Sequence, residues 1–175
     1  SNYNNLQNIT ANNNNIGFYL IYKADYNNFS SITANNNNYG FYLQNSQYNT
    51  LQDIIANNNN IGFYFYTPAR YNTLRDITSN YNNYGFYLGT SDNTFRDITS
   101  NYNVNSSFYL NGLADNNVLQ NITANYNGQN GLHFSNADNN VLQNITANYN
   151  GQNGLYLSVL SWYGSNNNTV SSSTF

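Results

Sequence analysis

A repeat of about 22 residues runs through the whole 175-residue chain. The phrase Leu-Gln-Asn-Ile-Thr-Ala begins at residue 6, and variants of it begin at residues 29, 51, 74, 95, 119 and 142, at spacings of 21 to 24 residues. A second phrase, typified by Gly-Phe-Tyr-Leu at 17–20, follows in every copy. Repeats of this length form single structural units that become stable by stacking on one another, so we predict one repeat domain over 1–175.

Both phrases have the periodicity of β-strands. Phe18 and Leu20 lie on either side of Tyr19, and apolar Ile9 is followed two residues later by small Ala11. Asn-rich segments such as 12–15 separate the phrases and are typical of corners. Helical repeats need about 33 residues or more. We therefore predict an all-β parallel β-solenoid of about seven coils, with a partial eighth at 170–175.

Stacking converts equivalent positions of the repeat into columns that run along the solenoid, with coils about 4.8 Å apart. Five positions per coil are apolar or small and are expected to face the interior, which gives a continuous core in a rod roughly 35 Å long. In the first coil these positions are Leu6, Ile9, Ala11, Phe18 and Leu20.

The pattern Asn-x-x-Leu-x-Asn-Ile-Thr, followed by Asn-Gly-Leu-Tyr-Leu, resembles the right-handed parallel β-helix repeats of pectate-lyase-like and NosD-type surface proteins. The resemblance implies a right-handed coil with three short strands per turn. Right-handedness also agrees with the rule for crossovers between parallel strands. The resemblance implies little about activity, because this fold carries lyases, hydrolases, adhesins and inert spacers alike.

Composition excludes several function classes. The chain has four basic residues, seven Asp, no Cys and no Met, so clustered cations for nucleic acid and soft metal ligands are both missing. No apolar run approaches the roughly 20 residues of a membrane-spanning helix. The first residues do not have the pattern of a signal peptide, so a secreted protein would be represented here in its mature or excised form. We expect an extracellular or cell-surface location and no cofactor.

A column of aromatic residues is predicted on the outside of the second strands. The column has two possible interpretations. Its rings stabilise the solenoid by stacking, or they form a contact strip for a sugar or a neighbouring protein. We call it the tyrosine strip: Tyr19, Tyr42, Tyr64, Tyr87, Tyr109, His133 and Tyr156.

A column of carboxylates is predicted on three consecutive coils, at Asp53, Asp76 and Asp97. Its simplest explanation is Asp replacing Asn at a tight corner, with Arg75 and Arg96 offsetting the charge. The same column is also a weak candidate for a Ca²⁺ site, because calcium prefers oxygen ligands. Carboxyls about 5 Å apart are also suited to sugar hydrolysis. We expect no catalytic residues and no metal, with this column as the exception to examine.

The motif Asn-x-Ser/Thr predicts attachment of N-linked glycans. An exposed coat of glycans would suit a surface with only 6% charged residues. The six candidates are Asn8, Asn28, Asn105, Asn121, Asn144 and Asn167.

Neither end of the chain has the pattern of a capping helix, and the longest turn is expected at 158–165. An open solenoid end exposes core and unpaired strand edge, which allows two interpretations. Either the domain stacks head to tail on copies of itself, which is the one we expect, or the chain is a fragment of a longer solenoid whose further coils are the caps. The primary hypothesis is a structural, N-glycosylated subunit of a filament or surface assembly that is not an enzyme and contacts glycans. The alternative hypothesis is a carbohydrate-binding or carbohydrate-cleaving module of a larger surface protein.

Overall fold

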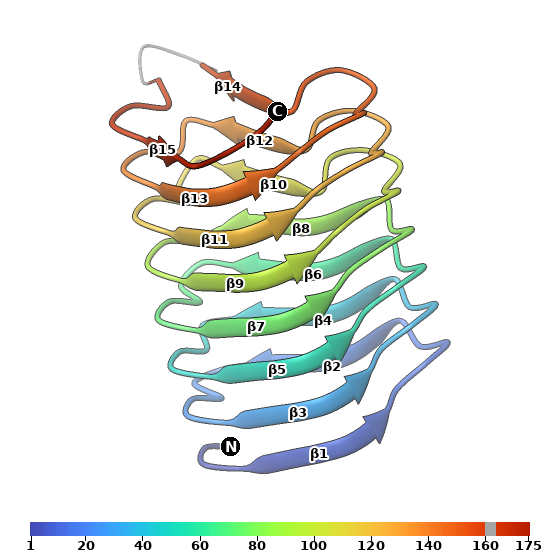
Figure 1. The fold of residues 1–175 in the computed structure, drawn as a ribbon. Helices are drawn as coiled ribbons and strands as arrows, with labels where there is room; N and C mark the ends of the chain where they lie inside the picture. The colour runs from blue at the N-terminus through green and yellow to red at the C-terminus, as the bar shows by residue number, and fades with distance from the viewer. Residues whose placement is uncertain (160–163) are drawn as a thin grey trace.

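The computed structural model describes residues 1–159 and 164–175, and this part of the chain contains strands and turns but no helix. The chain winds into a right-handed parallel β-helix of about seven turns, rising from the N-terminus to the C-terminus (Figure 1). The predicted fold class is confirmed. No helix of the described residues is long and apolar enough to span a membrane.

Two parallel sheets form the walls of the solenoid, and each strand pairs with the equivalent strands one coil away. The larger sheet, in front in Figure 1, contains β1 (Asn5–Thr10), β3 (Asn28–Thr33), β5 (Thr50–Ile55), β7 (Thr73–Thr78), β9 (Thr94–Thr99), β11 (Val118–Thr123), β13 (Val141–Thr146) and β15 (Thr169–Ser171). The sheet behind it contains β2 (Ile16–Ile21), β4 (Tyr39–Gln44), β6 (Ile61–Tyr66), β8 (Tyr84–Gly89), β10 (Phe108–Asn111), β12 (Leu132–Ser135) and β14 (Leu155–Ser158).

Left-handed residues turn the chain at the corners of each coil. In the second coil, Tyr26, Ser31 and Asn36 follow one another at five-residue spacing, with φ of 57°, 54° and 56°. The middle one lies inside β3 and bends that strand, and the equivalent residue bends every other full strand of the larger sheet. The resemblance implied three strands per coil, but the structure has two, because one bent strand supplies two sides of the coil.

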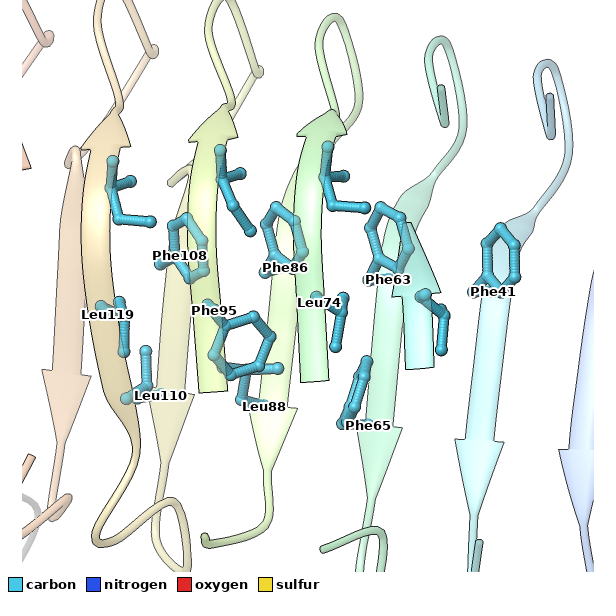
Figure 2. Close-up of a cluster of buried hydrophobic side chains, with 14 of the residues drawn as sticks. Phe41, Phe63, Phe65, Leu74, Phe86, Leu88, Phe95, Phe108, Leu110 and Leu119 are labelled. Carbon is cyan, nitrogen blue, oxygen red and sulfur yellow. The ribbon is translucent and has the colours of Figure 1, made fainter. Parts of the chain in front are cut away.

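The interior columns are confirmed. Phe41, Phe63, Phe86 and Phe108 lie on consecutive strands of the smaller sheet and are fully buried, with neighbouring ring centroids 4.3–5.2 Å apart (Figure 2). Phe95, from the larger sheet, meets Phe86 edge to face at 5.8 Å. Because every coil contributes the same positions, the core continues through the rod.

Two ladders of buried Asn line the corners of the coil beside this core. Asn59 is only 4% exposed; its Oδ1 accepts the backbone N–H of Asn37 at 2.8 Å, and its Nδ2 donates to the carbonyl of Ala34 at 3.0 Å. Asn72, in the other ladder, accepts the backbone N–H of Asn49 at 2.9 Å. These amides satisfy backbone groups that the turns leave unpaired, as buried polar groups require.

The two ends of the described coil are less covered than its middle. Leu6 and Phe18 of the first coil are only partly buried, and Leu157 of the last is 45% exposed. Part of the long turn expected at 158–165 lies outside the described residues. Stacking of copies head to tail stays a prediction.

Candidate functional site

A charged strip lies on the larger sheet, across β5, β7 and β9. It comprises Asp53, Asp76, Asp97, Arg75 and Arg96, which are five of the chain's eleven charged residues (four basic and seven acidic). The register pairs Arg75 with Arg96, so the two cations lie in one column and the three carboxylates in the next. With coils about 4.8 Å apart, charged groups gather here as nowhere else along the larger sheet.

The carboxylates lie at the bend of their strands. Asp53, Asp76 and Asp97 have φ of 53°, 57° and 55°, and all three are exposed. Asp and Asn tolerate this left-handed backbone better than most residues, which explains why Asn or Ser occupies the column in the other coils. The bend at the same time directs each side chain outward from the solenoid.

The three carboxylates have different neighbours. The Arg75 guanidinium lies 3.6 Å from the carboxylate of Asp76, and Arg75 also donates to Gln52 of the previous coil. Asp97 accepts a hydrogen bond from Nδ2 of Asn121 at 2.7 Å. Within the described residues, the side chain of Asp53 makes no hydrogen bond or ion pair. One carboxylate is therefore held by a cation, one by an amide, and one is open to solvent.

The described residues contain no group of three or more His, Cys, Asp or Glu side chains arranged to hold a metal ion. The three Asp are thus stacked in a column without converging on one point. The weak calcium candidate at this column stays a prediction.

The tyrosine strip lies on the outer face of the smaller sheet, as predicted. Tyr42, Tyr64 and Tyr87 meet edge to face with centroids 4.9 and 5.3 Å apart, and Tyr39 and Tyr84 pack beside them. Burial within this cluster, with neighbouring phenols adding to it, raises the pKa of Tyr64 to about 12. The strip is thus a close-packed row of aromatic rings.

His133 takes the place of a tyrosine in this row. Its ring lies 4.9 Å from that of Tyr109 and 4.7 Å from that of Tyr156, and its Nε2 is 2.9 Å from Oγ of Ser158. Burial lowers the pKa of the imidazole, so the ring stays uncharged near neutral pH. Its packing is that of one more ring in the strip.

The structure separates the two features for which the sequence suggested a role with carbohydrate. The charged strip is on the larger sheet and the tyrosine strip on the smaller sheet, with the hydrophobic core between them (Figure 1). A single sugar ring cannot contact both. Any site must therefore be built on one face or the other.

Two further tyrosine ladders were missed by sequence reasoning. Their rings stack nearly parallel at 4.9–5.3 Å on the corners that border the larger sheet. Both ladders have a member in the fourth coil, where Tyr71 and Tyr81 stand five residues before and after Asp76, on different corners, at 47% and 57% exposure. Tyr recurring at the repeat spacing was the signal that could have revealed them. The ladders are Tyr3, Tyr26, Tyr48 and Tyr71, and Tyr81, Tyr102, Tyr126 and Tyr149.

The candidate glycosylation residues are mostly at the surface. Asn8, Asn28, Asn121, Asn144 and Asn167 are exposed, and Asn105 is half-buried. Some of these amides are already engaged between coils: Asn144 donates to Asn121 at 2.9 Å and Asn28 to Asn5 at 3.0 Å. Glycosylation stays a prediction.

The coil is similar to solved carbohydrate-active proteins. The periplasmic alginate epimerase AlgG superposes with a TM-score of 0.80 at 19% identity, over 86% of this chain and 37% of the other. Pectate lyase Pel9A superposes with a TM-score of 0.59 at 18% identity, over 91% and 55%. The catalytic domain of a GH87 α-1,3-glucanase superposes with a TM-score of 0.51 at 14% identity, over 98% and 50%.

These similarities show a shared right-handed parallel β-helix, and this chain spans roughly a third to a half of the length of those proteins. No protein-family model and no curated protein sequence matches the chain. The prediction that the chain is not an enzyme is contradicted by these neighbours, because all three are carbohydrate-modifying enzymes. Acid–base chemistry on sugars needs only two carboxyls, and a chain with seven Asp can supply them.

Proposed function

We propose that the chain is a carbohydrate-cleaving β-helix module, and that the charged strip of the larger sheet is its active site. The observation that carries the proposal is the gathering of three Asp and two Arg on three consecutive coils of a chain with so few charges. A secreted or surface location is part of the proposal, and it is supported by one similar structure that is described as periplasmic.

Asp53 and Asp76 are the proposed catalytic pair. They stand at equivalent positions of neighbouring coils, whose backbones lie about 4.8 Å apart, so carboxyls that point the same way would have the separation of about 5 Å that suits a nucleophile and an acid/base in glycoside hydrolysis with retention. Their surroundings differ in a useful way. Arg75 lies against the carboxylate of Asp76 and holds it in place for the role of nucleophile. Asp53 is the proposed acid/base, which protonates the leaving oxygen and then takes a proton from the attacking water.

The tyrosines on either side of Asp76 are the proposed supports for the sugar chain. Tyr71 and Tyr81 are exposed on the two corners that border the strip in the coil that contains Asp76. Phenol rings offer an apolar face to the C–H groups of a pyranose and a hydroxyl for hydrogen bonding. A polysaccharide lying across the larger sheet would meet a ring before and after the carboxylates.

Release of reducing ends from a panel of neutral and acidic polysaccharides tests this function. Asp76→Asn should abolish the activity, and it should not disturb folding, because Asn occupies the same column at Asn121 and Asn144. Asp138→Asn is the matched control: it removes a charge elsewhere and keeps an oxygen to accept the backbone N–H of Asn166. Equal activity in wild type and Asp76→Asn would refute the assignment of the active site.

A further inference from the structure

A notch opens on the outer face of the smaller sheet, at a column of outward-facing residues in which one coil has a glycine. The column runs from Gln44 to Tyr66 to Gly89 in the register of β4, β6 and β8. Leu88 pairs with Leu110, so Asn111 follows in the next coil. A Cβ added at Gly89 would meet only the carbonyl oxygen of Phe65, at 3.7 Å, so the space above this glycine is open.

The notch is a cavity of about 330 Å³ with aromatic walls and a few polar groups. Tyr66 closes one side, Asn111 and the exposed Leu113 the other, and Tyr64 and Tyr87 of the tyrosine strip stand alongside. Nδ2 of Asn111 is 3.4 Å from the hydroxyl of Tyr87, so the two polar groups point to the same place. This volume and this mixture of surfaces are typical of a small-ligand site.

We propose that this notch is a binding site for one ring of a neutral sugar chain. The rings of Tyr66 and Tyr64 provide apolar faces for the sugar C–H groups, while the Asn111 amide and the Tyr87 hydroxyl can each donate to and accept from its hydroxyls. None of the residues lining the notch is charged, which favours a neutral sugar over a uronate.

The notch is distinct from the proposed active site. It lies on the smaller sheet, whereas Asp76 lies on the larger one, on the far side of the core. The two share coils three to five of the solenoid, so one chain could hold a polysaccharide at the notch while the charged strip acts on another strand. The inference extends the proposed function and can be tested without any catalytic activity.

Filling the notch tests the proposal. Gly89→Gln restores the side chain that the column carries at Gln44, and Gly89→Ala is the control that leaves the cavity open. Calorimetric titration with neutral gluco-, manno- and xylo-oligosaccharides, and with uronate oligosaccharides, should show binding of a neutral one to wild type and Gly89→Ala. Tyr66→Ala removes one aromatic anchor and should weaken the binding of that oligosaccharide about tenfold or more. Gly89→Gln excludes the sugar from the cavity and should weaken binding by a similar factor.

The outcomes separate this inference from the proposed function. Asp76→Asn should bind the neutral oligosaccharide as wild type does, even though it loses cleavage. Equal binding by wild type and Gly89→Gln, binding only of uronates, or binding of no oligosaccharide would each overturn the notch assignment and leave cleavage at the charged strip standing. A change in self-association in Gly89→Gln, without any sugar binding, would instead make the notch a contact between copies and also overturn it.

Discussion

Two adjacent asparagines of one corner should differ sharply in their contribution to stability. Asn59 is buried and Asn60 is exposed, although both form hydrogen bonds to neighbouring coils. Asn59→Ala leaves the buried N–H of Asn37 and the buried carbonyl of Ala34 without their side-chain partner. Each orphaned buried group costs about 1–3 kcal/mol. We therefore expect a loss of about 3 kcal/mol or more in the free energy of unfolding.

Asn60→Ala is the matched control. It removes only exposed bonds, those of Nδ2 to Asn38 and of Oδ1 from Asn83, and exposed groups are rehydrated at a cost below about 1 kcal/mol. Urea unfolding followed by circular dichroism measures both variants. With an m-value of about 2 kcal/mol/M, Asn59→Ala should lower the midpoint by about 1.5 M and Asn60→Ala by less than about 0.5 M. Midpoints that agree within error would refute the view that buried amides hold the corners.

Two further predictions concern close packing and the tyrosine strip. Gly62→Ala would place a Cβ 2.7 Å from the carbonyl oxygen of Gly85, so overpacking should cost about 1–3 kcal/mol in urea unfolding, whereas Gly89→Ala, which meets nothing closer than 3.7 Å, should be neutral. Equal stabilities would contradict this. Because folding raises the pKa of Tyr64 to about 12 from the ordinary 10.0, its contribution is complete below pH 10 and is lost as the pH rises toward 12. Urea midpoints measured across this range should fall less steeply in Tyr64→Phe, and identical slopes would show that Tyr64 does not titrate this way.

Much of the fold was accessible from the sequence because contacts in a solenoid join equivalent residues of successive repeats. Alternation in Phe18-Tyr19-Leu20 placed the core and the tyrosine strip correctly, since aligning the repeats is the same as stacking the coils. Glycine is not the usual corner residue, however. In the described residues the left-handed corner positions hold mainly Asn, Asp, Tyr and Ser, and Gly112 is the one glycine with positive φ. Glycines such as Gly62 serve instead to let neighbouring backbones approach closely.

The candidate sites depended on where the chain bends and which side chains are buried, and periodicity does not predict either. The solenoid fold, the length of each coil and the columns could all be predicted before the structure, because each needs only the repeat and the alternation of apolar residues. The tertiary structure decided where the chain bends, and therefore that the charged strip and the tyrosine strip face away from each other. The tertiary structure also decided which asparagines are buried, since the neighbours Asn59 and Asn60 point to different sides of the closed coil. It is also the tertiary structure that leaves a cavity beside Gly89, where the column lacks a side chain.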